Sequence, residues 1–212
     1  MGMVHQNSKI KSVIFDLGRV LVKVDFTRGL FRFITAHEPK SDQEILNRIF
    51  KDEIFIAFST GKLEPSQLYQ LIHTKYHLDL PYESFVQEWC DIFAPMEGME
   101  ELVLEVAEQY PLGLLSDTDP LHWPYCLQKF SFLKLFNRPT LSYETGLLKP
   151  DPQCYHLAAK NSYTTPEYCL FIDDREENVS GAMRTGMSAL HFKGVESLRL
   201  ELMELHIISD RR

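Results

Sequence analysis

The sequence of 212 residues has no apolar run that approaches the ~20 residues needed to span a bilayer. Residues 1–6 also lack the apolar stretch of a signal peptide and the residue pattern of a myristoylation site. We therefore expect a cytoplasmic protein without a membrane partner.

The sequence also lacks the patterns of a zinc site and of a nucleic-acid-binding surface. Its four cysteines are far apart, and none belongs to a C-x-x-C pair or to a paired-histidine pattern. Basic residues are few, with 22 Lys and Arg against 30 Asp and Glu, which gives a net charge of −8. This balance argues against nucleic acid or an anionic membrane as partner, so a phosphate ligand would need a local site.

The remaining composition is that of an ordinary globular protein. Apolar residues make up 44% and charged residues 25%, while glycine and proline number only 10 and 11. Disordered, collagen-like and disulfide-scaffold classes are therefore excluded. At roughly 150 residues per domain, the length fits one domain or a core with a modest insertion.

Three short apolar runs end in acidic or hydroxyl residues, which is typical of buried parallel strands with polar loops at their tips. These runs are 12–15, 112–115 and 169–172. Apolar residues at helical spacing occur in four further segments, 99–110, 152–161, 177–185 and 195–205. Together they predict an α/β fold, in which a Rossmann-like parallel sheet core carries helices on both faces.

Residues 25–93 interrupt this alternation, because apolar residues repeat there at helical spacing without a convincing strand. The segment 61–65 is typical of one helix ending and the next beginning, since glycine favours helix ends and proline the first helical turn. We expect an inserted all-helical cap at 25–93 and an α/β core formed by 1–24 and 94–212.

Polar residues at the strand ends form one candidate site, because the carboxyl ends of parallel strands open into a shared crevice. The candidates are Asp16, Ser116, Lys149, Asp173 and Asp174. Crowded carboxylates raise one another's proton affinity, and their oxygens suit Mg²⁺, which lets them stay ionised. A free carboxylate, a hydroxyl, a lysine and Mg²⁺ together serve phosphoryl transfer through an aspartyl-phosphate. Each residue alone is weak evidence for such a site, because residues of these types are common in loops and helix caps.

Four motifs make the pattern specific to one family. In order they are 15–21 (FDLGRVL), 115–118 (LSDT), 149–152 (KPDP) and 171–174 (FIDD). They resemble the motifs of the haloacid dehalogenase-like hydrolase superfamily over nearly the whole chain. The D-L-G opening, the helical cap and the D-D-x-x-x-N ending at Asn178 are similar to those of capped alpha-D-glucose-1-phosphate phosphatases.

The resemblance implies a Mg²⁺-dependent phosphatase that hydrolyses a small phosphorylated metabolite, such as a sugar phosphate, through an aspartyl-phosphate. Asp16 would be the nucleophile. Ser116 and Asp117 would bind the phosphoryl group, and Lys149 would neutralise it, in binding and in catalysis.

The resemblance also implies a metal site. Asp16, the Gly18 carbonyl, Asp173 and Asp174 would hold Mg²⁺. Asp174 ranks first of the acidic pair. Asn178, one turn further on, would orient this loop or cap a helix.

Two positions depart from the family pattern. Phosphatases of the superfamily usually carry a second Asp two residues after the nucleophile, where Gly18 has no side chain. Such an acid contributes ~10²–10⁴-fold, so its loss favours good leaving groups unless another residue substitutes. Asp117 stands where the nearest branch has Asn, and an ionised carboxylate there would repel the phosphate.

Several residues have both a functional and a structural interpretation. His122 follows a strand-end motif and has a pKa range that suits proton transfer, but Asp119 could cap a helix whose first turn exposes His122. Trp89, Phe93 and Phe58 could line a substrate pocket, although aromatic residues at helical spacing more often belong to a core.

Two other functions stay open. A metal-independent haloacid dehalogenase also uses an Asp nucleophile without the second acid, but it has no need of the Asp173–Asp174 pair. A catalytically weakened phosphometabolite-binding protein would account for both Gly18 and Asp117. Dependence on Mg²⁺ distinguishes a phosphatase from the dehalogenase. Release of phosphate distinguishes a phosphatase from the phosphometabolite-binding protein.

Overall fold

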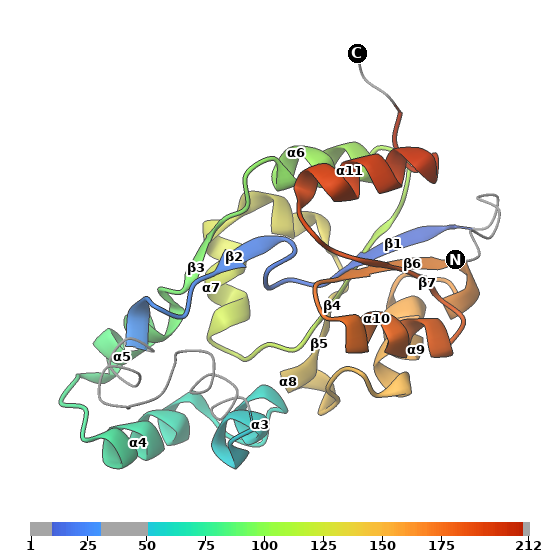
Figure 1. The fold of residues 1–212 in the computed structure, drawn as a ribbon. Coiled ribbons are helices and arrows are strands. Elements are labelled where there is room, and N and C mark those ends of the chain that lie inside the picture. Colours follow the sequence, from blue (N-terminus) through green and yellow to red (C-terminus); the bar gives the residue numbers. More distant parts are fainter. Residues whose placement is uncertain (1–9, 31–50, 210–212) are drawn as a thin grey trace.

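A parallel β-sheet forms the centre of the molecule. The computed structural model describes residues 10–30 and 51–209. Its main sheet has five parallel strands in the order β5-β4-β1-β6-β7 (Figure 1). The strands are β1 (Ser12–Phe15), β4 (Leu112–Ser116), β5 (Thr140–Leu141), β6 (Cys169–Asp173) and β7 (Ser188–His191).

The central strand is β1, and all of its residues are buried. Val13 pairs with Leu112 on one side and with Leu170 on the other, so both edges of β1 are hydrogen-bonded. Its side chains alternate between two hydrophobic clusters, with Val13 and Phe15 in one and Ile14 in the other. A strand covered on both faces needs a continuous apolar run, and all three strands predicted from such runs are confirmed.

Helices cover both faces of the sheet, as predicted. One face carries α6 (Met99–Ala107) and α11 (Val195–Glu204), and the other carries α9 (Pro152–Asn161) and α10 (Glu176–Arg184) (Figure 1). The remaining core helices are α7 (His122–Lys129), η1 (Ser131–Leu135), α8 (Ser142–Thr145) and η2 (Pro166–Tyr168). Within the described ranges, no helix has the length and apolar character needed to cross a membrane.

A two-stranded antiparallel ribbon leads from the core into the insertion and back. It consists of β2 (Val22–Val24) and β3 (Phe93–Pro95). In the described part of the segment between them lie α3 (Glu53–Ser59), α4 (Pro65–Tyr76) and α5 (Tyr82–Cys90). The helix end and restart predicted in 61–65 are confirmed, since α3 ends at Ser59 and α4 begins at Pro65. The apolar repeat predicted over 31–50 lies outside the described residues.

The insertion packs against the core through aromatic side chains. Trp89 of α5 is 2% exposed, and its ring stacks with those of Phe55 and Phe85 at centroid distances of 5.6 and 5.8 Å. Trp89 belongs to the same hydrophobic cluster as Trp123 and Cys126 of α7. The helices of the insertion and the α/β core therefore share one hydrophobic core.

Gly113 in β4 lies where the packing leaves no room for a side chain. A Cβ there would lie 2.8 Å from Ile14 Cγ1 and in closer contact with Ser162 Oγ. We predict that Gly113→Ala lowers the free energy of unfolding by about 1–3 kcal/mol, the usual range for overpacked cores. Urea denaturation measures this change, and an unchanged midpoint would contradict the tight packing of β4 between β1 and α9.

Candidate active site

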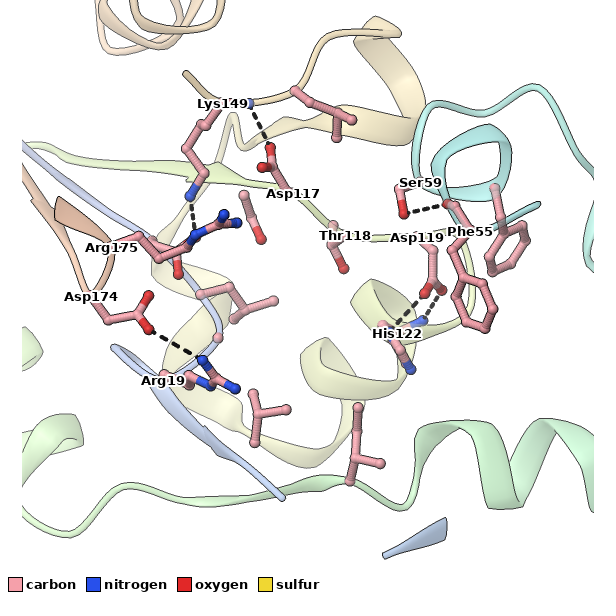
Figure 2. Close-up of a pocket in the computed structure, with 18 of the residues that line it drawn as sticks. Arg19, Phe55, Ser59, Asp117, Thr118, Asp119, His122, Lys149, Asp174 and Arg175 are labelled. Atoms are coloured by element: carbon pink, nitrogen blue, oxygen red, sulfur yellow. Dashed lines mark hydrogen bonds and ion pairs between the residues drawn. The ribbon is translucent and has the colours of Figure 1, made fainter. Parts of the chain in front are cut away.

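The carboxyl ends of β1, β4 and β6 open into one cavity. It has a volume of about 610 Å³ and is lined by residues of both the core and the insertion (Figure 2). Six of the seven site residues expected from the sequence line it, namely Asp16, Gly18, Ser116, Asp117, Lys149 and Asp174. The seventh, Asp173, is fully buried beside Lys149.

The ammonium group of Lys149 lies at the centre of the polar site. Its Nζ donates to Asp16 Oδ1 (2.5 Å), to Asp173 Oδ2 (2.7 Å) and to the carbonyl of Leu115 (3.3 Å). These three acceptors match the three protons of an ammonium group, and only 3% of the side chain is exposed. Lys149 thereby joins the ends of β1, β4 and β6.

Burial and neighbouring charges act against each other in this cluster. Burial is the largest cause that raises the pKa of Asp16, and the carboxylates of Asp173 and Asp174 also raise it, while Lys149 lowers it. The net result is a pKa of about 7. Burial lowers the pKa of Lys149, but the surrounding carboxylates, Asp16 foremost, hold it above its usual value. Lys149 thus stays charged, whereas Asp16 needs further positive charge to be fully ionised at neutral pH.

The two acids at 173–174 have different surroundings. The oxygens of Asp173 accept hydrogen bonds from Asn178 Nδ2 (3.0 and 3.1 Å) and from the backbone N–H of Arg175 (2.8 Å). The Asn178 side chain therefore orients Asp173 and does not cap the helix. Asp174 lines the cavity, where its Oδ2 lies 3.8 Å from Arg19 Nη1. Asp173 is saturated by protein donors, while Asp174 faces the space that a ligand would occupy.

The oxygen donors of the cavity suit a hard divalent cation. Asp16, Gly18 and Asp174 line it together and offer two carboxylates and a backbone carbonyl. In the part of the chain that the structure describes, no group of three Asp, Glu, His or Cys side chains forms a complete metal site. Mg²⁺ does not require one, because it commonly binds one or two carboxylates and completes its shell with water and substrate phosphate. The residues therefore fit Mg²⁺ bound together with a phosphorylated ligand.

Ser116, the last residue of β4, and Asp117, the first residue of the loop that follows, lie at the cavity wall. Asp117 Oδ1 accepts a hydrogen bond from the backbone N–H of Lys149 (3.0 Å), which joins this loop to the one that carries the lysine. Burial raises the pKa of Asp117, and Lys149 opposes the rise. The backbone N–H of Thr118 donates to Ser142 Oγ, which in turn donates to the Thr118 carbonyl, both at 2.9 Å. The carboxyl of Asp117 is thus held in a fixed loop.

An apolar neighbour borders the position of Gly18. A Cβ at Gly18 would lie 3.3 Å from Val24 Cγ2 of β2. In the described residues, β2 therefore supplies no acid in place of the one that Gly18 lacks.

Two arginines were not anticipated from the sequence. Arg19 and Arg175 line the cavity on either side of Asp174 (Figure 2). Each directly follows a motif residue, Gly18 or Asp174, so adjacency to the motifs is the signal that could have identified them.

Residues 10–186, which carry all of these site residues, match the sequence profile of a haloacid dehalogenase-like hydrolase. The chain belongs to this hydrolase family. The resemblance of its four motifs is thereby confirmed.

Known relatives align with almost the whole hydrolase. It is 26% identical over 201 residues to D-ribitol-5-phosphate phosphatase of Bacteroides thetaiotaomicron, covering 91% of this chain and 97% of the relative. It is 28% identical over 205 residues to flavin mononucleotide hydrolase 1 of Arabidopsis thaliana, covering 96% and 81%. A crystal structure of a haloacid dehalogenase family enzyme from B. thetaiotaomicron, in complex with magnesium and inorganic phosphate, matches with a TM-score of 0.75 at 26% identity, covering 87% and 95%.

A second polar cluster joins the insertion of the hydrolase to its core. Asp119 Oδ1 accepts hydrogen bonds from the backbone N–H groups of Leu121 (2.9 Å) and His122 (2.8 Å), so it binds the start of α7, although this helix begins at His122 and its N-cap residue is Leu121. Asp119 Oδ2 contacts His122 Nδ1 (2.7 Å) and accepts from Trp89 Nε1 (3.2 Å). Figure 2 shows the contacts between Asp119 and His122. The cluster therefore links α5 to the loop before α7.

The expectation that His122 is exposed is wrong, because its side chain is only 12% exposed. Its Nε2 lies 3.0 Å from the carbonyl of Trp89, and its ring stacks on that indole at 5.4 Å between centroids. Both ring nitrogens of His122 therefore contact oxygen atoms of the protein. The aromatic residues Trp89, Phe93 and Phe58 are buried and also border the cavity, so they serve as core and lining together.

We predict that Asp119→Ala lowers the free energy of unfolding by about 3–5 kcal/mol, as expected when one partner of a buried ion pair is removed. His122→Ala should then cost far less in the Asp119→Ala background than in the natural chain, because their contact is already lost. Denaturation of all four proteins measures this coupling. Strictly additive effects would show that the two side chains do not stabilise each other.

Proposed function

We propose that this hydrolase is a Mg²⁺-dependent phosphatase that cleaves a small phosphorylated metabolite through an aspartyl-phosphate on Asp16. The observation that carries the proposal is the ion pair between Asp16 and Lys149, 2.5 Å long and located on the wall of the shared cavity. A carboxylate held by a fixed cation is a nucleophile in a set position. Ser116 and Asp174 line the same cavity and supply a hydroxyl and a second carboxylate.

In the first step, Asp16 attacks the phosphorus atom and the bond to the leaving oxygen breaks. Lys149 offsets charge on Asp16 and on the phosphoryl oxygens, and the Ser116 hydroxyl donates to one of those oxygens. Fixed donors of this kind stabilise the charge that builds up in the transition state. In the second step, water attacks the phosphorus of the aspartyl-phosphate and releases inorganic phosphate.

Asp16, the Gly18 carbonyl and Asp174 are the groups that would hold Mg²⁺. When bound, the ion supplies positive charge that lowers the pKa of Asp16 and balances the phosphoryl oxygens. The rise of the Asp16 pKa to about 7 supports this role, because the protein alone leaves the nucleophile partly protonated. Asp173 would hold Lys149 in place and would not contact the ion directly.

The substrate class rests on the relatives and on the size of the cavity. The names of two relatives refer to D-ribitol-5-phosphate and flavin mononucleotide. A cavity of about 610 Å³ has room for a phosphoryl group with a sugar or a flat ring attached. We therefore expect sugar phosphates or other small phosphomonoesters as substrates.

The proposed cap domain is residues 25–93, and the proposed core is 1–24 with 94–212. Phe55, Phe58 and Ser59 of α3 line the same cavity as Asp16, which supports a role of the insertion in enclosing the substrate. In this arrangement the insertion selects the substrate, while the nucleophile comes from the core.

Phosphate release from a panel of sugar phosphates, flavin mononucleotide and an aryl phosphate, with and without Mg²⁺, tests the proposed function. We expect release that depends on Mg²⁺. The absence of phosphate release from every compound would contradict the proposal. Halide release without metal from 2-haloacids would support a dehalogenase instead.

Replacing the nucleophile gives the first prediction for this site. Asp16→Asn should abolish phosphate release, because the amide cannot attack phosphorus. The melting temperature should not fall, since the amide is nearly isosteric and Lys149 keeps its contact with Asp173. Residual activity within tenfold of the natural protein would remove Asp16 as nucleophile.

The acidic pair offers a matched comparison for the metal site. Asp174→Asn should raise the Mg²⁺ concentration needed for half-maximal rate, because one anionic oxygen ligand is lost, and should leave stability nearly unchanged. Asp173→Asn should instead lower stability, because Asp173 is fully buried against Lys149. Mg²⁺ titrations of activity and urea denaturation of both variants measure these effects. An unchanged titration for Asp174→Asn would move the ligand role to Asp173.

A further inference from the structure

The phosphatase function proposed above, on which this inference rests, requires a group that protonates the departing oxygen of an alkyl phosphate. Gly18 has no side chain, and the apolar Val24 borders its position. The donor must therefore come from elsewhere on the cavity wall. Among the residues that the structure describes, this wall carries one histidine and four carboxyl groups, namely His122, Asp16, Asp117, Asp119 and Asp174.

The cluster of Asp119 and His122 is occupied by structural contacts. Both ring nitrogens of His122 are engaged, one with Asp119 and the other with the carbonyl of Trp89. Both oxygens of Asp119 are engaged as well, one with two backbone N–H groups and the other with His122 and Trp89. Neither side chain can exchange a proton with a ligand unless the contact between insertion and core is broken.

The carboxylates around Lys149 have other functions. Asp16 is the proposed nucleophile, and Asp174 is the proposed metal ligand. Asp173 lies off the cavity wall, fully buried and bound by Lys149 and Asn178. None of the three is available as a proton donor to the leaving group.

Asp117 combines a fixed position with an available oxygen. Its Oδ1 accepts the hydrogen bond from the Lys149 backbone N–H at 3.0 Å, drawn as a dashed line in Figure 2. Its Oδ2 accepts no hydrogen bond from residues 10–30 or 51–209, although Asp117 lines the cavity. Because it directly follows Ser116, the proposed phosphoryl ligand, Asp117 lies where the phosphorylated end of the substrate binds.

We propose that Asp117 is the general acid and base of the reaction and replaces the side chain that Gly18 lacks. In the first step Asp16 bonds to phosphorus, the bond from phosphorus to the leaving oxygen breaks, and the Asp117 carboxyl gives its proton to that oxygen. In the second step the Asp117 carboxylate takes a proton from water, and the water oxygen bonds to phosphorus. The bond from phosphorus to Asp16 breaks, and phosphate leaves with Asp117 protonated again.

The surroundings of Asp117 favour a carboxyl that can hold a proton. Burial raises its pKa and Asp173 raises it further, while Lys149 and Arg175 lower it, with a net rise. Proton transfer is most efficient when the pKa of the donor lies near the working pH. A pKa above that of an ordinary Asp therefore favours this role. A protonated carboxyl also donates a hydrogen bond and does not repel the phosphate, which resolves the conflict expected from the sequence.

Two substrates with different leaving groups distinguish a general acid at Asp117 from a carboxylate that only repels the phosphate. Asp117→Asn is compared with the natural chain on two substrates, glycerol phosphate and p-nitrophenyl phosphate, in the presence of Mg²⁺. Nitrophenolate leaves without a proton, so the rate of its initial burst should differ by less than about threefold between Asp117→Asn and the natural chain. Turnover of glycerol phosphate, whose alkoxide needs a proton, should fall ~10²–10⁴-fold. Inorganic phosphate should inhibit the variant at least as strongly as the natural chain, which shows that the site is intact.

A nearby acid provides the control. Asp151→Asn makes the same chemical change in a residue that caps α9 and does not line the cavity, and it should leave both rates unchanged. Faster turnover of glycerol phosphate by Asp117→Asn, or equal losses on both substrates, would overturn the role of Asp117 and leave the phosphatase function standing. A natural chain that releases phosphate from neither substrate would overturn the phosphatase function and this role together.

Discussion

The buried ammonium of Lys149 is the contact on which the rest of the site depends. It binds Asp16 after β1, the Leu115 carbonyl in β4 and Asp173 in β6, so a single cation links the ends of three adjacent strands. The strand order β4-β1-β6 brings these three acceptors within reach of one side chain. Without the ammonium, buried carboxylates would lack their counter-charge, which typically costs about 3–5 kcal/mol.

One cation does not balance all the acids of this cavity. Burial raises the pKa of Asp16, Asp117 and Asp174, and neighbouring carboxylates add to each rise. In the proposed mechanism, Mg²⁺ relieves Asp16 and Asp174. Asp117, whose pKa is raised by burial, instead serves as the general acid in that mechanism. The two departures from the family pattern then explain each other, since the acid absent at Gly18 is supplied from the end of β4.

The sequence predicted best those strands that are buried on both faces of the sheet. The strands β1, β4 and β6 are apolar because both faces are covered, and the polar residues after them must share one crevice. The strands β5 and β7 were not predicted, because β5 has only two residues and β7 has no buried residue. The burial of His122 depends on Trp89, which is 33 residues away, and local patterns carry no such information. The order of Asp174 before Asp173 rested on the family resemblance alone, because the backbone direction decides which of them faces the cavity.

A covalent phosphoryl group on Asp16 is the central claim, and trapping it tests the account most directly. The protein is mixed with an aryl phosphate and Mg²⁺, quenched in acid within the first turnover and digested for mass spectrometry. We expect one phosphoryl group on the peptide that contains Asp16. Borohydride reduction of this acyl phosphate should convert residue 16 to homoserine. Phosphate release without any such peptide, or a phosphoryl group on another residue, would contradict the account.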